Sequence, residues 1–224
     1  ITIQHDDAVV GTEEETLVSM RERMQARRAQ TSRIDALIEG LEDLEGVNKA
    51  KFFFNYSPDE SSTVHGITVP PRMGLLIVQG SSTDVAKTFY AYMSCETTDC
   101  SSVYPDRAVT TTFTTKAGQT IPVYYLMPVQ EPVYIKVYVK GELQTDVENN
   151  LKLVCASAAQ NLGINDSLTS SDVIKLIQER LPDVLFDGVE LSKDGVTYSY
   201  VVGTSDLDGL LTTNYANVSV EVSA

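Results

Sequence analysis

Residues 131–140 read EPVYIKVYVK, and this stretch says most about the fold. Apolar and polar side chains alternate along it, which is typical of a β-strand with one buried and one solvent-facing side. The predicted buried side carries Val133, Ile135, Val137 and Val139, and the opposite side carries Tyr134, Lys136, Tyr138 and Lys140. Prolines at 128 and 132 lie where this strand begins, so we place a boundary there between two lobes, residues 1–130 and 131–224.

Upstream of this strand, the sequence predicts helices combined with a sheet. The apolar run at 73–79 indicates a buried strand, and the turn at Gly80 leads into a helix at 83–94. Alternating residues at 108–115 and 120–127 predict a hairpin. Two helices are expected at 13–29 and 33–44, with one long helix that has a polar middle as the alternative. A strand at 47–56 and loops at 57–72 and 95–107 complete this part.

Downstream, apolar residues at helical spacing predict a helix at 145–162 that stops at Gly163. Thr169 and Asp172 have the spacing of a capping box, which marks the start of a second helix. The remaining predicted elements are strands at 185–191, 196–203 and 215–222, the first two joined around Lys193-Asp194-Gly195. Together these patterns predict an α+β fold of two lobes, with helices packed on mostly antiparallel sheets.

The composition excludes several classes of protein. Of the 224 residues, 42% are apolar and 21% are charged, which excludes wholesale disorder. Acidic residues outnumber basic ones by 31 to 17, a net charge of −14, so neither nucleic acid nor an anionic membrane surface is an expected partner. No apolar run reaches the roughly 18 residues that a membrane-spanning helix needs. Because the chain begins with Ile1 rather than Met, we expect an excised fragment or a processed product.

The sequence offers few residues for catalysis or metal binding. Cys95, Cys100 and Cys155 are too few for a disulfide framework, although the first two could pair. There are two histidines: His5 lies near the start of the chain and His65 lies in a loop bounded by prolines. Surface histidines are the preferred interpretation of both, rather than members of a catalytic or zinc-binding set. Residues 206–209 look like part of a calcium loop, but a turn between strands is the preferred interpretation. We therefore predict no enzyme activity, no cofactor and no metal.

Two groups of residues are candidates for a protein interface. The first is an arginine-rich stretch in an otherwise acidic chain, and it suits either a solvated helix face or a docking surface for an acidic partner, including another copy of the chain. The second is the tyrosine-bearing side of the strand at 131–140. The candidate interface residues are Arg21, Arg23, Arg27, Arg28, Arg33, Tyr134 and Tyr138.

The order of these features resembles a known family. Residues 11–16, GTEEET, followed by Arg21 and Arg23, resemble the G-x-x-x-E-T-x-x-x-x-R-x-R opening of the baseplate J-like family. Further matching features are Thr31, the Leu44–Val47 step, Gly80, the helix start at Asp84–Ala86, the turn at Gly118, the strand Val133–Val139, Leu162–Ile164 and Leu185–Val189. The chain departs from the family at Gln79, where a glycine is usual, and in the loop at 95–107.

This resemblance implies a structural wedge component of a contractile phage tail baseplate or a related injection machine. Such a protein would bind itself, as a homodimer or ring, and other wedge and hub proteins. It would be assembled in the bacterial cytoplasm and reside in the virion tail baseplate. Two alternatives remain open: a secreted or cell-surface bacterial binding module, and a hydrolase whose catalytic groups lie in the loops at 57–72 and 95–107.

Overall fold

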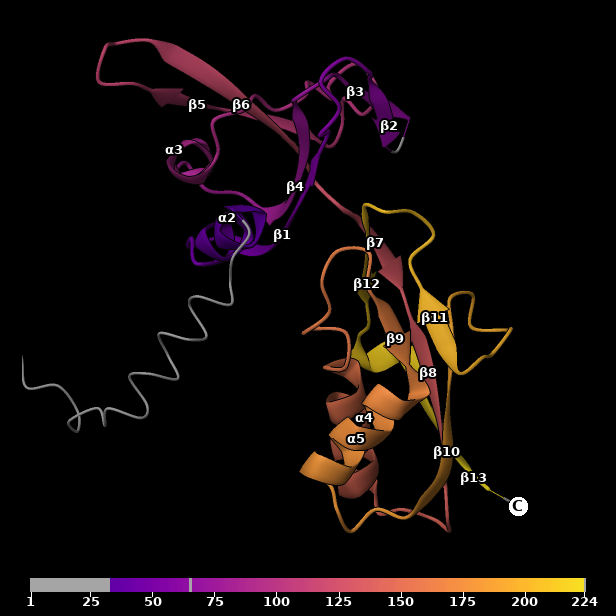
Figure 1. Ribbon diagram of the computed structural model, residues 1–224. Coiled ribbons are helices and arrows are strands. Elements are labelled where there is room, and N and C mark those ends of the chain that lie inside the picture. Colours follow the sequence, from indigo (N-terminus) through magenta and orange to yellow (C-terminus); the bar gives the residue numbers. More distant parts are fainter. Residues whose placement is uncertain (1–32, 65, 224) are drawn as a thin grey trace, which may run out of the picture.

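The computed structural model describes residues 33–64 and 66–223, which form an α+β fold of two lobes, as expected (Figure 1). Here the first lobe means residues 33–126 and the second lobe residues 129–223. The predicted helix at 13–29 lies outside the described residues, as do both histidines.

The first lobe is a four-stranded sheet with two helices on one face. The strands lie in the order β1 (Val47–Phe54), β4 (Gly74–Gly80), β6 (Thr120–Leu126) and β5 (Ala108–Thr114), and only the β4–β6 pair is parallel. The helices are α2 (Arg33–Glu42) and α3 (Val85–Tyr92), and both were expected. Their apolar sides bury Leu37, Leu41, Val85, Ala86 and Phe89 against Phe52, Leu76, Val78 and Tyr125 of the sheet.

Strand β4 is buried on both of its faces. Leu75, Leu76, Ile77 and Val78 have no exposed surface, which explains the uninterrupted apolar run in the sequence. Leu76 and Val78 face the helices, whereas Leu75 and Ile77 belong to an apolar cluster on the other side of the sheet.

The segment at 57–72 was predicted to be a loop, but it contains a small hairpin. Strands β2 (Ser62–Val64) and β3 (Ile67–Val69) pair antiparallel within it. Asn55 fixes the ends of the segment, because its buried Nδ2 donates to the carbonyl oxygens of Glu60 at 2.8 Å and Val69 at 3.0 Å. A buried amide therefore supplies the closure that strand patterning alone does not reveal.

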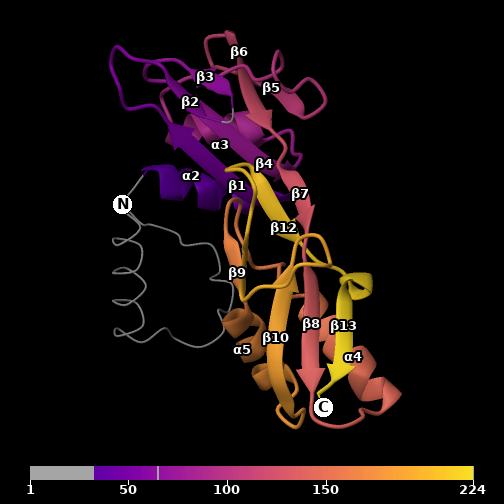
Figure 2. The ribbon, with the colours of Figure 1, turned by 90° about the vertical axis from the view of Figure 1, so that its right-hand side faces the viewer.

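The second lobe contains a three-stranded sheet in the order β10 (Phe186–Ser192), β8 (Tyr134–Val139) and β13 (Val218–Val222). Strand β8 pairs antiparallel with β10 and parallel with β13. Helices α4 (Thr145–Ala156) and α5 (Ser170–Arg180) cover one face, and Figure 2 shows them behind the sheet. The predicted buried side of β8 is confirmed, since Val133, Ile135, Val137 and Val139 are all buried.

The strand predicted at 131–140 is divided because it changes partners. Its first part belongs to β7 (Val129–Pro132), which pairs parallel with β12 (Gly209–Thr212), while β8 pairs with β10 and β13. Pro132 has no N–H to donate, and the next amide, of Val133, donates to the carbonyl of Thr212 at 2.7 Å. Strand β12 was not predicted.

Two predicted elements are shorter than expected. Helix α4 ends at Ala156 rather than 162, because Ser157 Oγ donates to the Val154 carbonyl and the following turns use bonds three residues apart. The strand expected at 196–203 is reduced to β11 (Val201–Gly203), which pairs with β9 (Ser167–Thr169). Asp194 bends the preceding loop by accepting from the amides of Val196 and Thr197 at 2.8 Å each.

Two further predictions concern helix and strand ends. The capping box of α5 is confirmed, because Thr169 and Asp172 exchange hydrogen bonds through their side chains and backbone amides. The last strand, predicted at 215–222, begins as a 3-10 turn at Tyr215–Asn217, where Asn214 Oδ1 accepts from two backbone amides. Only Val218–Val222 is extended.

Among the described residues, an apolar cluster and polar side-chain contacts join the lobes. The cluster comprises Ile67, Val69, Leu75, Ile77, Cys100 and Leu126 of the first lobe with Ile164 and Leu210 of the second. Lys51 Nζ donates to the Ile164 carbonyl at 2.8 Å. Arg107 Nη1 donates to Asp208 Oδ2 at 2.6 Å. The two lobes therefore pack directly on each other as well as being connected through the chain.

Candidate docking surfaces

The first candidate surface is a groove of about 400 Å³ at the end of the first lobe where α2 begins. Ile34, Phe54 and Met93 supply its half-buried apolar wall. Exposed Arg33 and Arg72 add positive charge. We call this the end groove; its lining is Arg33, Ile34, Phe54, Tyr56, Arg72, Met93, Ser94 and Cys95. Aromatic and arginine side chains around an apolar wall are the composition that dominates binding energy in protein interfaces.

Tyr56 is the most exposed aromatic residue of the end groove, with 74% of its surface accessible. Its ring packs edge-on against Phe54, with 4.8 Å between the ring centroids. Phe54 stacks on Phe52, and Phe52 meets the fully buried Phe89 at 5.5 Å. A row of rings therefore connects the exposed tyrosine to the core, so Tyr56 loses little conformational freedom when a partner binds it.

Arg72 is held at the groove by an unusual backbone conformation. Its φ of 59° lies in the left-handed region, which residues other than glycine seldom adopt. Its amide donates to the Asn55 carbonyl at 3.1 Å, within the closure of the 57–72 segment. The turn that places Arg72 beside Tyr56 is therefore fixed by the same asparagine that organises the hairpin.

The second candidate surface is the side of the β10–β8–β13 sheet opposite α4 and α5 (Figure 2). We call it the open sheet face. Tyr134, Lys136 and Tyr138 of β8 lie half-buried along it, beside Glu190 of β10 and Glu221 of β13. Among the described residues no helix covers this face.

The central side chains of the open sheet face hold each other in place. The Tyr138 hydroxyl donates to Glu190 Oε2 at 2.9 Å, and this bond raises the pKa of Tyr138. Lys136 Nζ lies 3.0 Å from Glu221 Oε1, which raises the pKa of Lys136. The same ammonium group lies over the ring of Tyr198, 4.5 Å from its centroid. The face is therefore an ordered array of aromatic and charged groups.

One end of the open sheet face is covered by the loop that follows β10. Gly195 of this loop adopts a φ of 71°, and a side chain there would touch the ring of Tyr134. The loop is anchored by Lys193, whose ammonium group contacts the carboxylate of Glu131. Burial alone would raise the pKa of Glu131, but hydrogen bonds from Lys193 and Ser205 outweigh it and lower the pKa. Tyr134 is thus less available to a partner than Tyr138.

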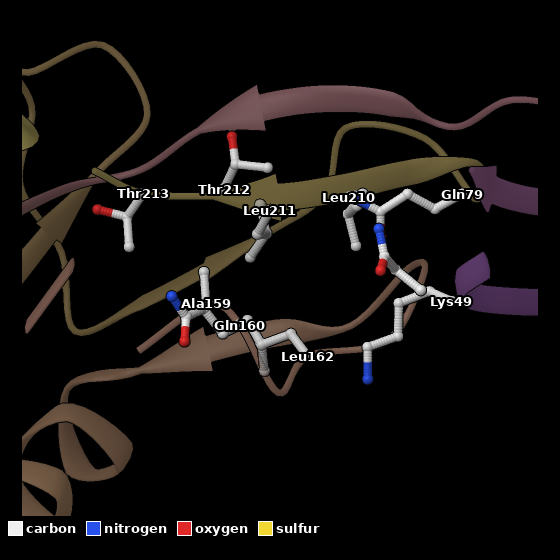
Figure 3. A pocket seen from close by; sticks show the side chains of 10 residues that line it. Lys49, Gln79, Ala159, Gln160, Leu162, Leu210, Leu211, Thr212 and Thr213 are labelled. Atoms are coloured by element: carbon white, nitrogen blue, oxygen red, sulfur yellow. The ribbon is translucent and has the colours of Figure 1, made fainter. Parts of the chain in front are cut away.

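A third hollow, of about 410 Å³, lies between the lobes. Figure 3 shows Leu162 and Ala159 on one wall and Leu210 and Leu211 of β12 on the other, with Lys49 and Gln79 at the end formed by the first lobe. Amide and hydroxyl side chains complete its lining, namely Asn48, Gln160, Thr212 and Thr213. This hollow, the inter-lobe groove, suits a polar ligand better than an apolar one.

The structure separates the predicted interface residues. Arg33 lies in the end groove, whereas Tyr134 and Tyr138 lie on the open sheet face of the other lobe. The remaining predicted residues, Arg21, Arg23, Arg27 and Arg28, lie outside the described part of the chain. Sequence reasoning missed Tyr56 and Arg72. The aromatic run FFFNY at 52–56 was a usable signal for the tyrosine, but nothing local distinguished the arginine.

The thiols and carboxylates that the structure describes do not gather into a reactive group. Cys95, Cys100 and Cys155 are all free thiols, and burial raises the pKa of each, that of Cys155 to about 12. Asp208, in the turn predicted at 206–209, is buried and paired with Arg107. Within residues 33–64 and 66–223, no cluster of three or more His, Cys, Asp or Glu side chains is arranged to hold a metal ion. None of the helices in these ranges is long and apolar enough to span a membrane.

Comparison with known proteins adds no assignment. The chain matches no family model, and no curated protein matches its sequence. The resemblance to the baseplate J-like family therefore stays a prediction.

Proposed function

We propose that this chain is a structural wedge component of the baseplate of a contractile phage tail or a related injection machine. It acts by protein–protein assembly around the tail hub, without catalysis. Its partners are further copies of itself and other wedge and hub proteins. Its place is the virion tail baseplate, after assembly in the bacterial cytoplasm.

The observation that carries the proposal is the presence of two candidate docking surfaces on different lobes. The end groove offers Tyr56 together with Arg33 and Arg72, and the open sheet face offers Tyr138 and Lys136. A scaffold protein must contact more than one neighbour at once, and two surfaces on one chain of two packed lobes meet that need. The packed junction between the lobes supports the proposal further, because it keeps the surfaces at a fixed separation.

The first experiment is quantitative mass spectrometry of purified contractile tails or injection particles from the source organism. The proposal expects peptides of this chain at a fixed ratio to a single-copy tail protein, in a multiple set by the ring symmetry. Absence from intact particles, with the protein found free or on the cell surface, contradicts it.

The second experiment tests the two surfaces separately by complementation of a strain that lacks the gene. Tyr56→Ala with Arg72→Glu changes the end groove, and Tyr138→Ala with Lys136→Glu changes the open sheet face. Lys116→Glu, on the exposed turn between β5 and β6, is the matched charge control. We expect each surface variant to lose incorporation into particles and the control to keep it. Normal incorporation of both surface variants would exclude these surfaces as contacts.

A bacterial binding module is the second candidate function, and the inter-lobe groove favours it. Its lining of amides, hydroxyls and one lysine offers hydrogen-bond donors and acceptors to a polar ligand such as a glycan. Glycan-array binding by the intact chain that is lost in Gln79→Ala and Gln160→Ala would support this alternative.

A further inference from the structure

We propose that the end groove is the docking site for a segment of the same chain, residues 13–29. The segment carries Leu17, Met20 and Met24 at helical spacing, a stripe that has to pack against an apolar surface if the segment is helical. This inference does not depend on the baseplate proposal.

The position of the groove in the chain makes it accessible to this segment. Arg33 and Ile34, the first described residues, already line the groove. A connector of residues 30–32 spans about 10 Å when extended, and a helix from Met24 to Ala29 adds about 8 Å. Met24 can therefore reach the wall of Ile34, Phe54 and Met93. Covalent linkage gives the segment a high effective concentration at the groove compared with a separate molecule.

Charge favours the acidic end of the segment at the groove. The end farthest from the connector carries Glu13, Glu14 and Glu15, and the groove lining contributes Arg33 and Arg72. This end of the segment therefore has the opposite charge to the groove, whereas the arginines nearer the connector have the same sign as Arg33.

The packing of the groove also calls for an apolar occupant. Tyr56 and Phe54 form an aromatic edge beside Met93, and thioether side chains such as those of Met20 and Met24 fill irregular aromatic gaps well.

Cys95 provides a native reporter for this docking. It lines the groove and is half-buried, whereas Cys100 and Cys155 are fully buried. The experiment measures the rate at which iodoacetamide alkylates Cys95 in the full-length chain, followed by peptide mapping. The test variant is Met20→Glu with Met24→Glu, which disrupts the stripe. The control is Ser19→Glu with Ala26→Glu, which adds the same charge on the opposite side of the predicted helix.

A segment that is docked roughly 90% of the time slows the reaction about tenfold, so we expect the test variant to react about tenfold faster than the parent and the control to match the parent. Equal rates in all three proteins overturn the proposal.

A cross-linking experiment identifies the chain that supplies the segment. Met24→Cys is oxidised with copper–phenanthroline, with Ala26→Cys as the control that lies nearer the connector but on the other side of the helix. We expect a disulfide from the new cysteine to Cys95 within one chain, seen as a monomer under non-reducing conditions whose peptide map contains the two linked peptides, and no linked peptides in the control. A disulfide-linked dimer instead assigns the groove to a second copy and overturns docking within the chain.

Discussion

Arg107 and Asp208 lie 101 residues apart in the sequence, yet the guanidinium of one donates to the carboxylate of the other at 2.6 Å. The Asp208 side chain is only 3% exposed, and the Arg107 side chain 23%. The pair joins the loop before β5 to the turn before β12 and so connects the two lobes. Stacking of the guanidinium on the ring of Tyr104, at 4.3 Å, orients it further.

Removing the Arg107 side chain is therefore expected to destabilise the protein strongly. Arg107→Ala removes the guanidinium that donates to the buried carboxylate of Asp208, a change that costs about 3 kcal/mol. Lys140→Ala is the control, because Lys140 pairs with Asp187 on the surface, where both side chains are well exposed and a pair contributes below about 1 kcal/mol. Urea unfolding measures both free energies. Equal losses would mean that the inter-lobe pair is no stronger than a surface pair.

Gly80 is predicted to be intolerant of any side chain. It adopts a φ of 110°, and a Cβ there would overlap the carbonyl oxygen of Gly46. We expect Gly80→Ala to cost about 3 kcal/mol or more, since both backbone strain and a steric clash oppose it. Gly118→Ala separates the two causes, because Gly118 has a φ of 81° but a Cβ added there would meet no atom within 4 Å, so only about 1–2 kcal/mol is expected. Thermal unfolding measures the loss of stability in each variant. A loss in Gly80→Ala no larger than that in Gly118→Ala would refute the steric clash.

Acid is expected to weaken the anchor of the loop that covers Tyr134. Because the folded-state pKa of Glu131 is lowered, its contribution to stability is complete above its ordinary value of 4.5 and is lost as the pH falls through the lower folded pKa. Glu131→Gln should therefore lower stability at neutral pH and lose less further stability on acidification than the parent. Unfolding free energies measured across the acid range test this, and parallel curves for parent and variant would count against it.

Cys155 is expected to react with thiol reagents only when the second lobe unfolds. It has no exposed surface, and burial raises its pKa to about 12, so little thiolate exists at neutral pH. Its labelling rate should rise with urea in parallel with the unfolding equilibrium. Rapid labelling in native buffer, at the rate of Cys95, would show that the α4 side of the core opens locally.

The alternation of residues 133–139 was the most informative signal in the sequence, because burial of one face dictates a period of two. The pair Thr169 and Asp172 was equally reliable, since a capping box depends on only four consecutive residues, here 169–172. The same reasoning failed at β12, whose four residues pair with β7 some 80 positions earlier, and at Asp208, whose partner lies 101 positions earlier. No local pattern carries such information.

In the candidate docking surfaces too, some residues could be predicted from local sequence and others depend on contacts between distant segments. The alternation of apolar and polar residues in its strand was enough to place Tyr138 on the solvent-facing side. The neighbouring strands then extend that side into a sheet face. Arg72 could not be foreseen, because its position depends on a left-handed turn and on a hydrogen bond from its amide to the backbone carbonyl of Asn55. The end groove exists only where α2, β1, that turn and the end of α3 converge.

The parallel pairing of β13 with β8 has a mechanical consequence. Strand β8 receives the chain from the first lobe at its beginning, and β13 leaves the sheet at its end, beside Val139. A pull applied between the first lobe and the C-terminal end would draw these two strands past each other along their length. The ladder from Val218 to Val222 would then carry the load in shear, with its bonds sharing the force instead of breaking one after another.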